Sequence, residues 1–118
     1  MARILVVDDA AFMRMRCSKL LTENGYQVVE AATGTEAVAS YKSNPPDAVL
    51  MDITMPDMDG LAALREIIKH DPQAKIAMVT AMGQQSLVMQ ALSDGAKDFV
   101  IKPFDSGRVL AAVKKLVA

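Results

Sequence analysis

The sequence predicts an α/β fold, in which an open parallel sheet is covered by helices on both faces. Short apolar or β-branched runs alternate with longer segments whose apolar residues recur at helical spacing. The short runs are apolar throughout, which is typical of strands buried on both faces of a parallel sheet. Turn and helix-stop signals separate most segments, so we expect one doubly wound domain over residues 1–118.

Five short runs are expected to form strands, because they are rich in residues that favour extended structure. In chain order they are residues 4–7, 28–29, 48–51, 76–79 and 99–101. Helices are expected between them, wherever apolar residues form a stripe at spacings of three and four. The stripe residues are Met13, Cys17, Leu20 and Leu21; Val38 and Tyr41; Leu61, Leu64 and Ile68; Val88, Ala91 and Leu92; and Val109, Val113 and Leu116.

Helix-capping residues support these boundaries. Thr33 and Glu36 have the spacing of a capping box, in which each side chain bonds a free amide of the first turn. Ser106 is expected to cap the last helix. Helix-stop signals follow the first, second and fourth helices, at Asn24–Gly25, Pro45–Pro46 and Asp94–Gly95.

Composition excludes several classes of protein. A length of 118 residues suffices for one core, and a formal charge of -1 provides no attraction to nucleic acid or anionic lipid. Cys17 is the only cysteine, which excludes an intramolecular disulfide and a cysteine-based zinc site and suggests a cytoplasmic protein. The apolar run at residues 4–7 is too short for a signal peptide or a membrane span.

Polar residues follow the predicted strands at one edge of the sheet. In doubly wound sheets ligands bind beyond the carboxyl ends of the strands. Asp8 and Asp9 follow the first strand, and Asp52 follows the third. Thr80 follows the fourth strand and Lys102 follows the fifth. We therefore expect three carboxylates, one hydroxyl and one ammonium to meet at this edge.

Such an edge is suited to phosphoryl transfer. Three converging carboxylates need a counter-charge, and oxygen ligands without histidine or thiolate favour Mg²⁺, which Asp8 and Asp9 would hold. Asp52 is the preferred nucleophile because it ends the central strand, and carboxylates form acyl-phosphate intermediates. Lys102 would pair with the phosphoryl oxygens, and Thr80 would bond one of them and shift its loop.

These residues occur in four motifs whose order and spacing resemble the receiver domains of bacterial two-component response regulators over the whole chain. Within that family the chain is most similar to the CheY-like chemotaxis regulators. The motifs are Ile4-Leu5-Val6-Val7-Asp8-Asp9, Met51-Asp52-Ile53-Thr54-Met55-Pro56-Asp57-Met58-Asp59-Gly60, Thr80-Ala81 and Lys102-Pro103-Phe104. The resemblance implies a flavodoxin-like, CheY-like fold with five helices and the strand order 2-1-3-4-5.

The resemblance also implies specific roles for the site residues. Asp52 would take a phosphoryl group from a phosphohistidine. Mg²⁺ would be held by Asp9, Asp52 and the main-chain carbonyl of Thr54, and by Asp8 through water. The peptide bond before Pro103 would be cis. At Phe99 many CheY proteins carry a tyrosine whose ring swings inward on activation, and Phe99 would follow the same motion by packing but has no hydroxyl.

By the same resemblance the chain would act as a monomeric switch in the cytoplasm, without binding nucleic acid or membrane. It would be no enzyme beyond catalysing its own phosphorylation and dephosphorylation. A CheA-like sensor histidine kinase would phosphorylate it, and a CheC- or CheX-type phosphatase could act on it. The face formed by the fourth helix, fifth strand and fifth helix would bind a FliM-like flagellar motor switch protein and so control flagellar rotation.

Other functions are weighed against this one. A phosphohydrolase of the haloacid dehalogenase type needs a second aspartate where this chain has Thr54. A flavodoxin-like nucleotide binder must hold phosphate in the loop after its first strand, where Asp8 and Asp9 would repel that phosphate. Alone, those two aspartates could be ordinary helix-capping residues. A phosphorelay intermediate and a phosphorylation-independent interaction module both remain open.

Overall fold

The computed structural model describes residues 1–53, 55, 58–81, 84–103 and 105–118. Its strands are β1 (Arg3–Val7), β2 (Gln27–Ala31), β3 (Ala48–Asp52), β4 (Ile76–Ala81) and β5 (Asp98–Lys102). Its helices are α1 (Ala11–Glu23), α2 (Gly34–Ser43), α3 (Gly60–His70), α4 (Gln85–Ser93) and α5 (Ser106–Val117). None of these helices is long and apolar enough, over its described residues, to cross a membrane. Each strand contains the run predicted for it and extends that run at one or both ends.

The strands form one parallel sheet in the order β2-β1-β3-β4-β5, which confirms the predicted topology. The chain moves outward from β1 to β2 and then crosses to β3 on the other side of β1. The strand order therefore reverses between β1 and β3, and a doubly wound sheet places its ligand crevice at that point. The carboxyl ends of β1 and β3 carry the predicted acidic residues.

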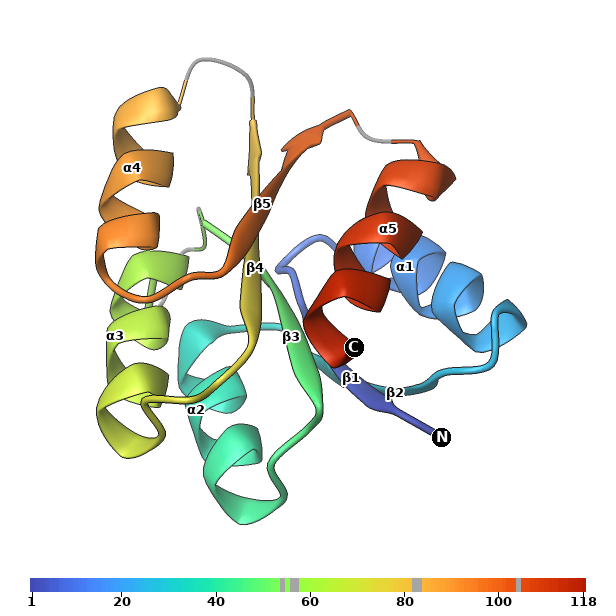
Figure 1. Ribbon diagram of the computed structural model, residues 1–118, viewed down its shortest axis with the longest axis horizontal. Helices are drawn as coiled ribbons and strands as arrows, with labels where there is room; N and C mark the ends of the chain where they lie inside the picture. Colours follow the sequence, from blue (N-terminus) through green and yellow to red (C-terminus); the bar gives the residue numbers. More distant parts are fainter. Residues whose placement is uncertain (54, 56–57, 82–83, 104) are drawn as a thin grey trace.

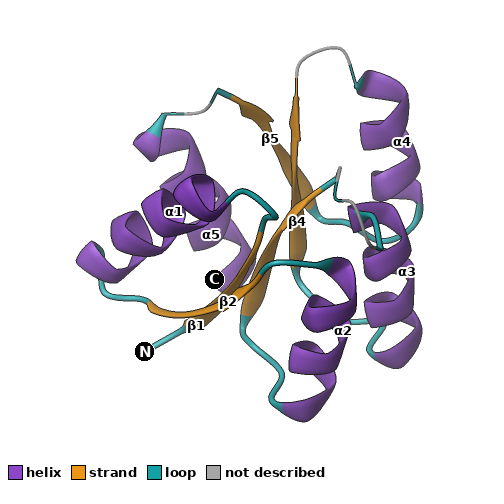
Figure 2. Ribbon diagram, turned by 180° about the vertical axis from the view of Figure 1, so that it is seen from behind, coloured by secondary structure: helices purple, strands orange, loops and turns teal. Residues whose placement is uncertain are grey.

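The helices lie in two layers, one on each face of the sheet. Helices α1 and α5 cover one face, and α2, α3 and α4 cover the other (Figures 1 and 2). Successive strand residues point to opposite faces, so Ile4 and Val6 pack with α1 and α5 while Leu5 and Val7 pack with α2 and α3. Burial on both faces explains why the strand sequences are apolar throughout.

The helix ends agree with the predicted signals, except at Ser106 and in one half of the predicted capping box, where the Glu36 carboxylate accepts from the N–H of Ala32 rather than from that of Thr33. Helix α2 begins after Thr33, whose Oγ1 accepts a hydrogen bond of 3.0 Å from the main-chain N–H of Glu36. The prediction that Ser106 caps α5 is wrong. Ser106 is already the first helical residue, and Asp105 is the cap, accepting a hydrogen bond of 2.7 Å from the N–H of Arg108.

Tyr41 links the ends of α2 and α3. Its ring is buried, and its hydroxyl donates a hydrogen bond of 2.7 Å to Oδ2 of Asp71, the residue that caps the end of α3. This bond, with a second from the N–H of Gln73, lowers the pKa of the Asp71 carboxyl. Because the folded pKa is lowered, the bond stabilises the protein above the ordinary carboxyl pKa and loses that effect in acid.

We expect Tyr41→Phe to lower the free energy of unfolding by about 1–2 kcal/mol at pH 7, because the hydrogen bond has a charged acceptor that is partly exposed. The loss should begin to fade as the pH falls below about 4, the ordinary pKa of a carboxyl, and should vanish once the pH is below the lowered pKa of Asp71. Urea unfolding at several pH values measures both effects. Tyr26→Phe is the matched control, since its hydroxyl has no hydrogen-bond partner among the described residues. An equal loss in both variants would contradict the assignment.

Candidate phosphoacceptor site

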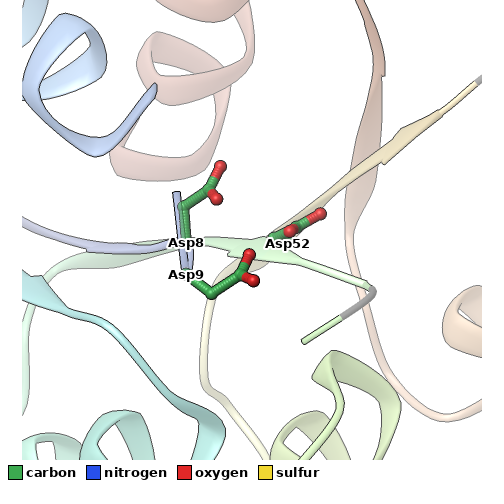
Figure 3. Close-up of side chains that lie close together, drawn as sticks. All are labelled: Asp8, Asp9 and Asp52. Atoms are coloured by element: carbon green, nitrogen blue, oxygen red, sulfur yellow. The ribbon is translucent and has the colours of Figure 1, made fainter. Parts of the chain in front are cut away.

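Three aspartates meet at the carboxyl edge of the sheet. Asp8, Asp9 and Asp52 each offer a carboxylate oxygen, and these atoms all lie within 4.8 Å of one another (Figure 3). Asp8 and Asp52 are 7% exposed, whereas Asp9 is exposed to solvent. The cluster is therefore a partly buried concentration of negative charge with one open side.

The parallel pairing of β1 and β3 creates this cluster. Val7 pairs with Met51, so the next residues, Asp8 and Asp52, lie at the same level at the carboxyl edge of the sheet. The Asp8 main-chain N–H donates to the carbonyl of Ala31 at the end of β2, which continues the sheet pairing to this residue. Residues far apart in the sequence are thus brought together by strand register rather than by a local motif.

Lys102 completes the cluster from β5. Its Nζ lies 3.1 Å from Oδ2 of Asp8 and 3.6 Å from Oδ1 of Asp52. It is the one cation within ion-pair distance of these carboxylates in the described part of the chain. The Lys102–Pro103 peptide bond is cis, as the family resemblance implied. Four of the predicted site residues therefore lie together.

Burial and charge alter the acidity of the cluster. Loss of solvent raises the pKa of Asp52 to about 6, with Asp8 and Asp9 contributing in the same direction and Lys102 opposing them. Burial disfavours the charged ammonium of Lys102, but Asp52 and Asp8 outweigh that effect and raise its pKa. The lysine therefore stays charged at neutral pH, and one ammonium faces three carboxylates.

The raised pKa of Asp52 predicts how its removal affects stability. Since the folded pKa lies above the ordinary value, ionisation of Asp52 destabilises the metal-free protein, fully so above about pH 6 and not at all below about pH 4. We expect Asp52→Asn to raise the free energy of unfolding by roughly 1–2 kcal/mol at pH 7.5 in EDTA. The gain should vanish near pH 4.

Chemical unfolding across this pH range, with and without Mg²⁺, tests that expectation. A divalent cation would offset the repulsion in the wild type, so Mg²⁺ should reduce the difference between the two proteins. Glu66→Gln is the control, because it removes one exposed charge that makes no ion pair within the described residues. A less stable Asp52→Asn protein at pH 7.5 would contradict the prediction.

The donor set suits a hard divalent cation. Its ligand atoms are carboxylate oxygens alone, and three negative charges exceed the single charge of Lys102. The open side at Asp9 leaves room for water ligands. The predicted fourth ligand, the main-chain carbonyl of Thr54, lies outside the described residues.

Thr80 and Phe99 lie nearby, but neither is bonded to the acidic cluster. The Thr80 side chain is buried at the carboxyl end of β4, and its hydroxyl donates to Oε1 of Gln84 at 2.7 Å. Phe99 is partly buried in β5 and lines an apolar cavity of about 300 Å³ between α4 and β5. The structure thus places both predicted switch residues beside α4.

Two contributors were missed from the sequence. Gln84 bonds the Thr80 hydroxyl, and its only sequence signal is a polar side chain four residues after a strand-end threonine. Gly60 lies where a Cβ atom would be 2.1 Å from the carbonyl oxygen of Asp52. The dipeptide Asp59–Gly60 before an apolar helix indicates only a capped turn, because the close approach exists only in three dimensions.

Comparison with known proteins identifies this arrangement. The family model described as "Response regulator receiver domain" matches residues 4–114. The chain belongs to this family. The geometry above accordingly describes a receiver domain, and the family implies a kinase partner and a downstream target.

Relatives of similar length share the whole domain. This receiver domain is 58% identical to chemotaxis protein CheY of Bacillus subtilis (strain 168), over 96% of this chain and 95% of that one. It is 54% identical to chemotaxis protein CheY of Thermotoga maritima, over 97% and 96% of the two chains. A CheY-like receiver domain protein of Methanospirillum hungatei superposes with a TM-score of 0.94 at 31% identity, over 99% of this chain and 94% of that one. The similarity is consistent with a chemotaxis response regulator.

Proposed function

We propose that this chain is a phosphorylation-controlled response regulator in which Asp52 accepts the phosphoryl group. The observation that carries the proposal is the convergence of Asp52 with Lys102 and two further carboxylates at the switch point of the sheet. Asp52 ends the central strand of the five, and its side chain is nearly buried yet adjoins the open side of the cluster. Such a carboxylate is a suitable acceptor, because acyl phosphates form on positioned carboxylates.

In the proposed transfer, one carboxylate oxygen of Asp52 forms a bond to phosphorus while the bond from phosphorus to the imidazole nitrogen of a phosphohistidine breaks. The leaving imidazole then takes a proton from solvent. Lys102, held within 3.6 Å of Asp52, would pair with the phosphoryl oxygens and so stabilise the charge that develops there. Thr80 would donate its hydroxyl hydrogen to one of these oxygens after leaving Gln84.

Mg²⁺ is the proposed cofactor. Asp8, Asp9 and Asp52 supply oxygen ligands of the type that it prefers, and the carbonyl of Thr54 is proposed as a further ligand. When bound, Mg²⁺ would neutralise negative charge on the acceptor and on the phosphoryl oxygens. Without a cation the cluster repels an incoming phosphoryl donor, so we expect phosphorylation to require Mg²⁺.

Similarity to chemotaxis proteins supports the proposed partners. A CheA-like histidine kinase would donate the phosphoryl group, and a CheC- or CheX-type phosphatase could remove it. The proposed target is a FliM-like motor switch protein, bound on the face made by α4, β5 and α5. Exposed apolar side chains on that face support such binding, namely Met89, Leu92 and Ile101 at 67%, 37% and 46% exposure.

We propose no activity on other substrates. The chain would catalyse only its own phosphorylation and the hydrolysis of its own acyl phosphate, acting as a monomer in the cytoplasm. The two alternatives are a phosphorelay intermediate and a phosphorylation-independent interaction module. The first would pass its phosphoryl group to a second histidine, and the second would take none.

The test is the intact mass of the protein after incubation with acetyl phosphate. We expect a gain of one phosphoryl group that requires both Mg²⁺ and Asp52, and therefore no gain for Asp52→Asn or in EDTA. No gain in mass under any of these conditions would contradict the phosphoacceptor proposal. If the phosphorylated protein binds a motor-switch peptide no better than the unmodified protein does, the proposed motor-switch target is wrong. The role of phosphorelay intermediate would then be favoured.

A further inference from the structure

Gln84 connects the switch hydroxyl to the start of α4. It is the N-cap residue of that helix, and its side-chain Oε1 accepts two hydrogen bonds from the end of β4. One comes from the Thr80 hydroxyl at 2.7 Å, and the other comes from the main-chain N–H of Ala81 at 2.9 Å. A single amide oxygen thus joins β4 to the N-cap of α4.

These contacts determine which group donates. The N–H of Ala81 can only donate, so the Gln84 atom that meets it must be the carbonyl oxygen. An amide oxygen can only accept, so Thr80 must supply the hydrogen of their shared bond. The other acceptor for this hydroxyl, the carbonyl of Ala81 at 3.2 Å, lies in the same loop. The one hydroxyl hydrogen of Thr80 is therefore directed to the β4–α4 connection.

This hydrogen is the one that Thr80 would need for phosphoryl binding. A hydroxyl has one hydrogen to donate, and a phosphoryl group offers only acceptor oxygens. Thr80 follows Val79, which pairs with Asp52 across the sheet, so the hydroxyl is close in register to the phosphoacceptor. The Gln84 oxygen and a phosphoryl group on Asp52 would consequently compete for the same hydrogen.

We propose that Gln84 is a positioning residue that holds Thr80 in the unphosphorylated arrangement, and that phosphorylation must break the Thr80–Gln84 bond. This proposal rests on the proposed function of Asp52. Loss of the bond removes one of the two side-chain links from β4 to the N-cap of α4, so the local event at the phosphoryl group reaches the helix directly.

The surroundings leave room for the resulting movement. The cavity of about 300 Å³ between α4 and β5 is lined by Thr80, Gln84 and Phe99, so both bonded residues border the same space as the aromatic ring. The first turn of α4 carries no acidic side chain that would stabilise it through the helix dipole. The main-chain carbonyl of Gln84 accepts hydrogen bonds from the N–H groups of Leu87 and Val88, so Gln84 is bonded both to β4 and to the first turn of α4.

Binding of beryllofluoride, a phosphoryl mimic, to the Mg²⁺-loaded protein measures the cost of breaking the bond. Gln84→Ala should bind beryllofluoride about 3- to 10-fold more tightly than the wild type, because the Thr80 hydroxyl then has to leave only the longer bond to the Ala81 carbonyl at 3.2 Å. Gln84→Glu keeps an acceptor and makes it stronger, so its affinity should fall. Gln85→Ala and Gln85→Glu are the controls for helix perturbation and added charge, and both should show smaller changes.

A double-mutant cycle separates the proposed role from general loosening of α4. In a Thr80→Ala background, Gln84→Ala should change the affinity by less than about twofold, because the bond is already absent. The same gain with and without Thr80, or a Gln84→Ala protein with wild-type affinity, would overturn the proposal. If the wild type does not bind beryllofluoride with Mg²⁺ and Asp52 intact, the proposed function fails instead.

Discussion

Lys102→Met should slow Mg²⁺-dependent phosphorylation of Asp52 by acetyl phosphate by about 10²- to 10³-fold. The ammonium lies 3.6 Å from the Asp52 carboxylate, on a side chain that is only 24% exposed, so it acts where solvent screens charge weakly. The Met side chain keeps an apolar stem of similar shape, one atom shorter than that of lysine, and carries no charge. The transferring phosphoryl group would then meet three carboxylates without their ion-pair partner.

The same substitution should also destabilise the metal-free protein. Removing one partner of a buried ion pair leaves an uncompensated charge, and the partial exposure of Lys102 reduces the expected loss to about 1–3 kcal/mol. Without the lysine, the pKa of Asp52 should rise further above its present value of about 6. Mg²⁺ should recover part of the lost stability, because it would replace the missing positive charge.

Initial rates from intact mass and urea unfolding in EDTA and in Mg²⁺ measure these two effects. Lys97→Met is the matched control, because Lys97 is exposed and forms no ion pair within the described residues. Lys102→Arg keeps the charge but replaces the compact ammonium with a planar group, so its rate should lie between those of the wild type and Lys102→Met. A wild-type rate for Lys102→Met would refute the assigned role.

Gly60→Ala should lower the free energy of unfolding by about 1–3 kcal/mol or more and slow phosphorylation by about 10²-fold. A Cβ atom at this position would lie 2.1 Å from the carbonyl oxygen of Asp52 and 2.8 Å from the Cα of Ile53. Both contacts are with backbone, which cannot rotate away. The Gly60 N–H also donates a 2.7 Å hydrogen bond to the carbonyl of Ile53, so α3 could not withdraw without losing it.

The effect on phosphorylation follows from which backbone is displaced. The crowded carbonyl belongs to the phosphoacceptor itself, so any shift that relieves the contact moves Asp52 relative to Lys102 and Asp8. Gly107→Ala is the control, since a Cβ there would meet only a side-chain oxygen of Asp105 at 3.4 Å. In the exposed first turn of α5, that change should be neutral or stabilising by up to about 1 kcal/mol. Equal stability and equal rates for both variants would exclude the proposed close contact.

The alternation of apolar runs and apolar stripes by itself determined which segments form strands and which form helices. Continuous runs such as residues 48–51 indicated strands buried on both faces, and the spacing of residues such as Leu61 and Leu64 indicated helices that cover them. From these two patterns and the general properties of parallel sheets, Asp8, Asp52 and Lys102 could be assigned to the carboxyl edge of the sheet. The family resemblance added the strand order.

Only the tertiary structure decided the contacts that depend on register and on exact backbone position. Distances from Lys102 to Asp8 and Asp52 follow from the alignment of separate strands, and the approach of Gly60 to Asp52 follows from how α3 packs at the end of β3. The Thr80 hydroxyl similarly has two nearby acceptors, and the tertiary structure places the Gln84 side chain closer than the Ala81 carbonyl. A local sequence pattern indicates which face of a strand or helix a residue occupies. The contacts named above depend instead on how elements distant in sequence pack against one another, and a local pattern contains no information on that packing.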